Sequence, residues 1–219
     1  MSHPRLVVIV RHGQSEHHVR KLTGGWTDTS LTALGHEQAR RVATRLKDEL
    51  GDREITLYTS DLLRAGETAR HIAGVFGVEP VIDDRLREHN NGEAANLTWE
   101  DAHARFPDAL SASIWSHDNP PWPGAETGRE FYARSASFLD SLRTEGPIPV
   151  VVTHGGTIMC LVARWLLIEP SAIAPIGFSA YTTAITVLTG DPFREVERLN
   201  DVAHLAGMTG WVPIGDLAS

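Results

Sequence analysis

The sequence is poor in cysteine, in positive charge and in long hydrophobic runs. Cys160 is the only cysteine, so no intramolecular disulfide can form, and a reducing compartment is expected. The 28 acidic side chains outnumber the 20 of Lys and Arg, and the resulting net charge of −8 argues against a nucleic-acid partner. The apolar run at 6–10 is too short for a signal peptide, and no stretch approaches the roughly 20 apolar residues of a membrane span. We therefore expect a cytoplasmic protein with no membrane partner.

Several catalytic motifs are also missing. No Walker-type Gly-x-x-x-x-Gly-Lys-Ser/Thr segment occurs, which excludes nucleotide binding of that kind. The segment 13–17 resembles half of a serine hydrolase's nucleophile elbow, but a histidine stands where the final glycine is needed. The histidines lack a His-x-x-x-His helix or a cluster of acidic ligands, which disfavours a metal hydrolase. The ligands of such an enzyme would have been His12, His17, His18 and His154.

What the sequence does contain is an alternation of strands and helices, with 42% hydrophobic residues to form a core. This pattern predicts one domain over 1–219, an α/β fold built as a three-layer α/β/α sandwich with a mainly parallel central sheet. The segment at about 84–125 is expected to be an inserted loop and helix over the active face. Strands are expected at 6–10, 55–59, 80–82, 148–152, 181–189 and 193–199, the last two antiparallel. Helices are expected from a Thr32 cap to about Gly51, from a Ser60 or Asp61 cap to about Phe76, over 131–142, over 157–168 and briefly from Thr98, with loops at 13–30 and 83–97.

Two of these strands end in a histidine. The runs at 6–10 and 148–152 are short, apolar and rich in β-branched residues, as in strands buried on both faces of a parallel sheet. Ligands of open α/β sheets bind beyond the carboxyl ends of the strands. A neutral imidazole can attack phosphorus, and a neighbouring guanidinium can hold phosphate oxygens in a bidentate fork. We therefore predict a reactive centre formed by Arg11, His12 and His154.

Two further charged residues are expected near the same crevice. Arg64 falls in the first turn of the helix that follows the strand at 55–59. A helix N-terminus favours anions and disfavours cations. The position of Arg64 is therefore better explained if an anion binds between its guanidinium and the N-terminus of the helix. Glu88 lies in a loop over the crevice and can act as a general acid if burial raises its pKa. Taken alone, each of these residues is better explained as a solvated surface side chain.

At this point the residues match a known family. The sequence resembles the histidine phosphatase superfamily, in its phosphoglycerate-mutase-like branch. The matching segments run in order from about Leu6 to Leu167, and five short motifs in register are far more specific than any one of them. The motifs are RHGQS at 11–15, LTALGHEQA at 31–39, SDLLRAGETA at 60–69, LREHNNG at 86–92 and VTHGG at 152–156.

The resemblance implies a role for each matching position. His12 would attack phosphorus and become a phosphohistidine, and Glu88 would protonate the leaving oxygen and later take a proton from water. His18 stands where the family often has Asn, and Ser15 where it has Thr or Ser. Neither a metal nor another cofactor would be needed, because the cationic pocket supplies the electrostatics. The implied phosphate-binding residues are Arg11, Ser15, His18, Arg64, His154 and Gly155.

The same comparison favours a phosphatase over a mutase. The mutase pattern after Glu88 has a Tyr where this chain has Asn91, and Gly-Leu-Asn-Lys where it has the segment 96–99. The paired arginines of the mutase insertion are also missing. We therefore predict a phosphomonoesterase whose partner is a small-molecule phosphate ester. A cofactor-dependent phosphoglycerate mutase and a non-catalytic phosphoester-binding module are the alternatives.

The substrate itself is not legible from the sequence. Four tryptophans lie in segments that can cover the crevice, which favours a partly apolar or ring-bearing leaving group, although two of them can equally serve only to pack the insertion. Loop histidines are expected to be solvated. The sequence leaves open whether the chain forms a homodimer. The tryptophans are Trp26, Trp99, Trp115 and Trp122, and the loop histidines are His17, His18, His89 and His117.

Overall fold

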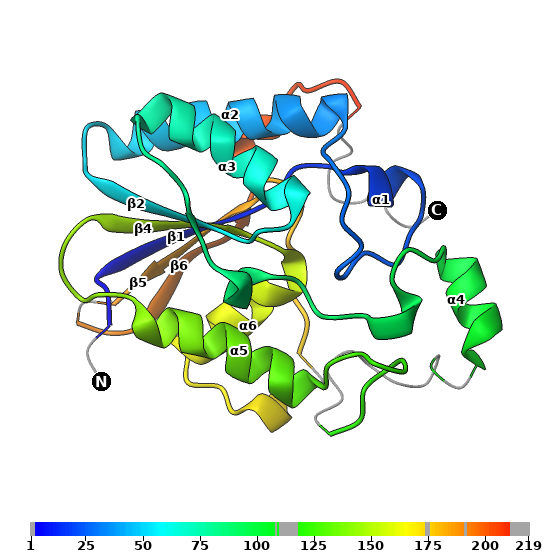
Figure 1. The fold of residues 1–219 in the computed structure, drawn as a ribbon. Coiled ribbons are helices and arrows are strands. Elements are labelled where there is room, and N and C mark those ends of the chain that lie inside the picture. Colours follow the sequence, from blue (N-terminus) through cyan, green and yellow to red (C-terminus); the bar gives the residue numbers. More distant parts are fainter. Residues whose placement is uncertain (1–2, 108, 110–117, 174–175, 191, 211–219) are drawn as a thin grey trace.

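The fold, seen in a computed structural model, is built on one mixed sheet (Figure 1). The structure describes residues 3–107, 109, 118–173, 176–190 and 192–210. Within this part of the chain the sheet has six strands in the order β3-β2-β4-β1-β5-β6. The first four in that order are parallel, whereas β5 and β6 are antiparallel additions at one edge. The strands are β1 (Leu6–Arg11), β2 (Ile55–Thr59), β3 (Val81–Ile82), β4 (Ile148–Thr153), β5 (Ile185–Thr189) and β6 (Glu195–Asp201).

Helices cover both faces of the sheet, and the predicted α/β/α sandwich is confirmed (Figure 1). In β1, Val8 and Val10 pack with α2 and α3 on one face, while Val7 and Ile9 pack with α5 and α6 on the other. Because both faces of β1 and β4 are covered, nearly every residue of these strands is apolar and buried. The helices are α1 (Glu16–Val19), α2 (Ala33–Leu50), α3 (Leu63–Phe76), α4 (Trp99–Arg105), α5 (Gly128–Ser141) and α6 (Gly155–Trp165).

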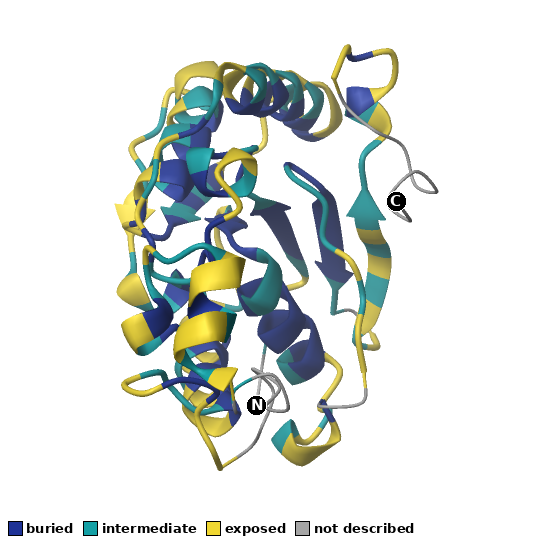
Figure 2. Cartoon of the chain, turned by 90° about the vertical axis from the view of Figure 1, so that its right-hand side faces the viewer, coloured by how far each residue is buried: buried dark blue, intermediate teal, exposed yellow. Residues whose placement is uncertain are grey.

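Burial falls off at the β6 edge of the sheet, as Figure 2 shows. Strand β6 alternates exposed and partly buried residues, because only one of its faces packs on the protein. By contrast, β5 is buried along almost its whole length. In the part of the chain that the structure describes, no helix is long and apolar enough to cross a membrane.

Local signals predicted several elements correctly. The Thr32 hydroxyl accepts a hydrogen bond from the Gly35 N–H at 3.0 Å and caps α2, and α3 ends at Gly77 with a φ of 69°. The short helix after Thr98 is present, and the Thr98 hydroxyl caps it by accepting from the Asp101 N–H. The loop at 83–97 contains two short 3-10 helices, Asp84–Leu86 and Gly92–Ala94.

The predicted start of α3 is wrong. Leu62, not Ser60 or Asp61, is the N-cap residue. The Ser60 hydroxyl accepts a hydrogen bond from the Leu62 N–H at 3.2 Å and forms a turn before the helix. The Asp61 carboxylate instead pairs with Arg87, which is 26 positions further along the chain. Asp61, which the local sequence predicts as a cap, therefore pairs with a residue distant in the sequence instead of capping the helix.

Several other boundaries also differ from prediction. The expected loop at 13–30 contains α1, because the Ser15 N–H donates to His18 Nδ1 in a capping arrangement that lacks the usual Glu or Gln. Helix α6 starts two residues early, directly after His154. The strand expected from Tyr181 begins only at Ile185, after a turn in which Thr183 has a φ of 58°. Its neighbour β6 begins and ends two residues later than expected, at Glu195–Asp201.

Candidate active site

The parallel register brings the two predicted histidines together. Arg11 at the end of β1 pairs with Thr153 at the end of β4, and the His12 N–H donates to the Thr153 carbonyl at 2.9 Å. A histidine directly follows each of these two strands. Because the strand ends are paired, the ring centroids of His12 and His154 lie only 5.1 Å apart. Both side chains are almost fully buried. The sheet thus places two imidazoles at its carboxyl edge, where ligands of such sheets bind.

His12 is held as a neutral ring with a defined tautomer. Its Nδ1 lies 2.7 Å from the Gly13 carbonyl oxygen, which can only accept, so Nδ1 carries the proton. Burial, followed by the charge of Arg64, keeps the pKa of His12 well below its usual value. The remaining nitrogen, Nε2, is unprotonated, and its electron pair accepts a hydrogen bond from Arg64 Nε at 3.2 Å. This atom is a nucleophile at neutral pH.

Arg64 is fixed by backbone carbonyls of the loop between β1 and α2. Its Nη1 donates to Thr27 at 2.8 Å, and its Nη2 donates to Gly25 at 2.7 Å. The side chain is only 1% exposed, and burial lowers its pKa to about 10. A guanidinium has five N–H groups, so this arrangement leaves two of them free to hold an anion.

Arg11 and His154 have polar atoms without partners. Arg11 Nη1 donates to the Ala180 carbonyl at 2.5 Å, but its buried Nε has no hydrogen-bond partner among the described residues. Both ring nitrogens of His154 are buried and equally without a partner there. Orphaned buried polar atoms are costly and mark places where a ligand completes the bonding. Burial also keeps the pKa of His154 well below its usual value, so the ring is neutral.

Glu88 reaches the same pocket from the loop after β3. Its Oε1 accepts from the His89 N–H and its Oε2 from the Gly156 N–H, each at 3.0 Å. The second bond attaches the carboxylate to the first turn of α6, where the helix dipole favours negative charge. A Cβ at Gly156 would lie 2.5 Å from Glu88 Oε1, so this carboxylate would have to move to make room for it.

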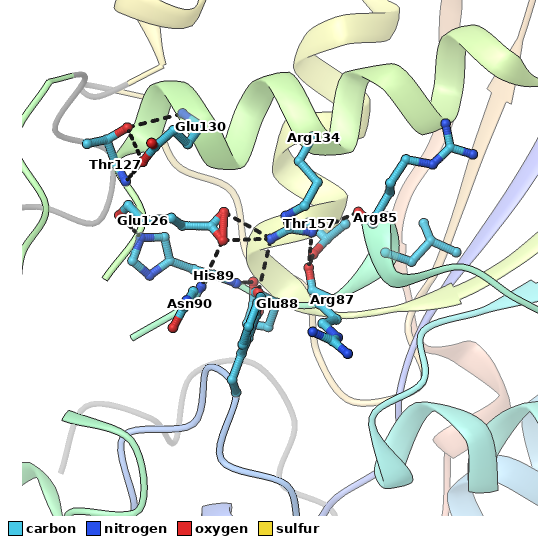
Figure 3. A network of polar contacts seen from close by, with 12 residues as sticks. Arg85, Arg87, Glu88, His89, Asn90, Glu126, Thr127, Glu130, Arg134 and Thr157 are labelled. Atoms are coloured by element: carbon cyan, nitrogen blue, oxygen red, sulfur yellow. Dashed lines mark hydrogen bonds and ion pairs between the residues drawn. The ribbon is translucent and has the colours of Figure 1, made fainter. Parts of the chain in front are cut away.

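The loop that carries Glu88 is held by Arg134 of α5 (Figure 3). Arg134 donates to the Arg85, Arg87 and Glu88 carbonyls at 2.8 to 3.2 Å and pairs with the Glu126 carboxylate at 3.0 Å. Glu126 in turn accepts from the backbone of the loop at Asn90. Sequence reasoning missed this pair, because neither residue stands in a motif and their partners are carbonyl groups of another segment.

These side chains line a pocket of about 510 Å³. It contains four of the five residues predicted to be catalytic; His154 lies buried beside His12, outside the lining. Ser15 and Gly155 are not among the lining residues either. Ser15 is fully buried and its hydroxyl lies 2.8 Å from His17 Nδ1. The lining comprises Arg11, His12, His17, His18, Lys21, Leu22, Thr23, Gly24, Gly25, Arg64, Glu88, His89, Asn91, Trp99 and Trp122.

The prediction that the loop histidines are solvated is wrong for His17 and His89. Their side chains are 7% and 3% exposed, and both line the pocket. Burial lowers the pKa of His17 to about 2. His18 is partly buried and lines the pocket as well. His117, like Trp115, lies outside the described residues.

His18 faces two donors at once. The Ser15 N–H points at its Nδ1 at 3.1 Å, and Arg11 Nη2 lies 2.9 Å from its Nε2. Burial and the nearby guanidinium of Arg11 lower the pKa of His18 to about 3, so the ring is neutral and can accept only one of these bonds. Because the Ser15 N–H is fixed by the backbone, we assign the His18 proton to Nε2, which then opposes Arg11. Two donors then face each other, and an anion that accepts a hydrogen bond from both would remove this unfavourable contact.

Comparison with known proteins places these motifs in a family. Residues 7–202 match the model of the histidine phosphatase superfamily, branch 1. A 2,3-bisphosphoglycerate-dependent phosphoglycerate mutase of Xanthobacter autotrophicus is 35% identical over 77% of this chain and 84% of its own. The phosphoglycerate mutase-like protein 4 of Arabidopsis thaliana is 33% identical over 95% of this chain and 90% of its own. The structure of a mycobacterial glucosyl-3-phosphoglycerate phosphatase in complex with VO3 is similar with a TM-score of 0.79 and 29% identity, over 90% of this chain and 100% of that one.

Proposed function

The chain belongs to the histidine phosphatase superfamily, and we propose that it hydrolyses a small phosphate monoester through a phosphohistidine intermediate on His12. One observation carries the proposal. The neutral His12 ring opens into a pocket whose charged lining, within the described residues, is three cations and one carboxylate. Such a pocket favours a phosphate anion and offers it a nucleophile. The cations are Arg11, Lys21 and Arg64, and the carboxylate is Glu88.

In the proposed first step, the electron pair of His12 Nε2 attacks phosphorus and the bond from phosphorus to the ester oxygen breaks. For this step Glu88 must be protonated, and its carboxyl group gives that proton to the leaving oxygen and becomes a carboxylate. In the second step water attacks the phosphohistidine, Glu88 takes the proton from that water, and the bond from phosphorus to nitrogen breaks. Arg11 and Arg64 hold the phosphoryl oxygens through their free N–H groups, and one ring nitrogen of His154 donates a further hydrogen bond.

The environment of Asn91 supports a phosphatase rather than a mutase. Asn91 occupies the position of the substrate-binding Tyr in the mutase pattern, but its side chain is committed to the protein. It donates to Thr23 Oγ1 and the Gly24 carbonyl, and it accepts from the Trp26 N–H. At the position of the mutase Lys the pocket has Trp99. The relatives include proteins named as mutases and as phosphatases, so activity must decide between them.

The test is hydrolysis of 4-nitrophenyl phosphate in the presence of EDTA. We expect turnover by the wild-type protein to survive chelation and His12→Ala to lose at least about a thousandfold in kcat, because removing the nucleophile leaves only binding and electrostatic effects. A phosphohistidine trapped by rapid acid quench of the wild type would identify the intermediate.

The control variant is His36→Ala, which removes an exposed histidine of α2 outside the pocket lining. Equal rates for wild type and His12→Ala would contradict the proposed nucleophile. Interconversion of 2- and 3-phosphoglycerate, faster than hydrolysis of either, would establish the mutase alternative. Binding of phosphate esters with no turnover would establish the binding module.

A further inference from the structure

The pocket is larger than a phosphate group requires. A volume of about 510 Å³ is of the size that holds a whole small-molecule ligand. Among the described residues that line the pocket, Leu22, Trp99 and Trp122 are the large apolar side chains, and Lys21 is the one charged side chain besides Arg11, Arg64 and Glu88. These four residues have no role in the proposed phosphoryl transfer, so they are available to contact the part of the substrate that leaves with the ester oxygen.

The wall is held rigidly against α4. The Trp99 N–H donates to the Lys21 carbonyl at 3.1 Å, and Leu22 forms an antiparallel bridge with Thr98. Lys21 itself has a φ of 54°, a conformation that costs energy for a residue with a side chain and persists only where neighbouring structure enforces it. Strained backbone of this kind gathers at ligand sites.

The two tryptophans offer an open ring surface. Trp122 is 7% exposed and packs against Ala94 and Ala102, whereas Trp99 is 45% exposed although it lines the pocket. Their ring centroids lie 6.2 Å apart at 56°, so neither ring covers the face of the other. A large apolar ring left exposed in a pocket wall is suited to stacking against a flat ligand.

Lys21 carries a positive charge to which the proposed phosphoryl transfer assigns no specific contact. Its ammonium has no ion pair or hydrogen bond within the described ranges, while most arginines there are paired with carboxylates. We propose, building on the phosphatase function, that the natural substrate is a phosphate monoester whose leaving group has a ring and a second anionic group. The ring stacks on Trp99 and the anion pairs with Lys21.

The experiment compares two esters of matched shape. 4-Carboxyphenyl phosphate carries the second anion, and 4-carbamoylphenyl phosphate replaces it with a neutral amide. We expect the wild-type kcat/KM to favour the carboxylate about fivefold, and this preference to vanish in Lys21→Met. Arg20→Met removes the same charge from the adjacent residue outside the pocket lining and should keep the preference. Trp99→Leu should lower kcat/KM for both aryl esters about tenfold and leave ethyl phosphate within about twofold, and Trp99→Phe should restore most of the loss.

The outcomes separate this inference from the phosphatase proposal. If the wild type hydrolyses both aryl esters equally well, or if Lys21→Met keeps the preference, the phosphatase proposal stands and the substrate inference is wrong. If the wild type hydrolyses no ester, the phosphatase proposal is wrong. In that case calorimetry can measure the dissociation constants of the two intact aryl esters. Binding of the carboxylate ester about fivefold more tightly, lost in Lys21→Met and kept in Arg20→Met, would support the substrate inference, and equal binding would contradict it.

Discussion

The side chains of the pocket are set by the backbone around them before any ligand binds. The carbonyl of Gly13 fixes the proton on His12 Nδ1, and two carbonyls of the following loop fix Arg64. Because these side chains are already in place, less free energy is needed to orient them during the reaction. Its price is a set of buried polar atoms, on His154 and Arg11 within the site, that have no partner among the described residues. The arrangement is reasonable only if an anion completes it.

His18 gives the sharpest test at the scale of single residues. An Asn side chain supplies one acceptor for the Ser15 N–H and one donor toward the pocket, as the assigned His18 tautomer does. We expect His18→Asn to keep kcat/KM for 4-nitrophenyl phosphate within about threefold. His18→Ala removes the donor and should lower kcat/KM at least about tenfold, the size of a lost hydrogen bond to a charged group. Wild-type kinetics for His18→Ala would show that His18 does not contact the phosphoryl group.

At the scale of elements, the start of α6 joins the two halves of the site. His154 is its N-cap residue, and its first turn begins with Gly155 and Gly156. The Gly156 N–H holds Glu88, while Gly155 lies beside Arg11. One helix end therefore positions the proposed general acid and lies against a phosphate-binding arginine.

Substitution by alanine should have a much larger effect at Gly156 than at Gly155. A Cβ on Gly156 would lie 2.5 Å from Glu88 Oε1 and 3.1 Å from the Phe131 ring, whereas a Cβ on Gly155 would meet Arg11 only at an ordinary 3.7 Å. We expect Gly156→Ala to lower kcat at least about tenfold by displacing Glu88, a loss typical of a misplaced general acid. Gly155→Ala should cost much less. Circular dichroism and thermal unfolding check that both variants fold, and equal kinetic losses would contradict the argument.

Sequence predicted elements well where a local signal decides the structure. The buried strands β1 and β4 and the Thr32 cap of α2 follow from apolar runs and a capping hydroxyl. The prediction failed where a distant group intervenes. Asp61 is withdrawn from the start of α3 by Arg87, and the turn at Thr183 delays β5 because its N–H is held by the Arg11 and His12 carbonyls. No local pattern contains these partners.

At the scale of the whole molecule, the site is a consequence of sheet topology. Parallel strands β2, β4 and β1 are neighbours, so their carboxyl ends bring segments from three distant parts of the sequence to one edge. Motif residues such as His12 and Arg64 were predictable from their place after a strand: His12 directly follows β1, and Arg64 lies in the first turn of the helix after β2. Arg134 and Lys21 were not, since their importance lies in tertiary contacts and pocket position.

The same edge concentrates neutral histidines, and this should make stability depend on pH. His12, His17, His18 and His154 all have pKa values lowered by burial, with that of His17 at about 2. In the unfolded chain these four histidines take up protons near pH 6.5, whereas in the folded protein they stay neutral. Their contribution to the free energy of unfolding is therefore complete above pH 6.5 and is lost as the pH falls below it. The carboxylates with lowered pKa values, such as Asp201, affect stability only at lower pH, below about 4.

We expect the free energy of unfolding, measured in urea, to fall by at least about 2 kcal/mol between pH 7.5 and pH 5.0, the contribution of a single histidine such as His17 that stays neutral when folded. His17→Gln keeps a polar partner for the Ser15 hydroxyl but cannot titrate, so this variant should lose about 2 kcal/mol less over the same interval. His103→Gln, outside the pocket lining, should behave as the wild type. An unfolding free energy that stays constant from pH 7.5 to 5.0 would mean that the buried histidines take up protons in the folded protein, and the neutral nucleophile assigned to His12 would then be wrong.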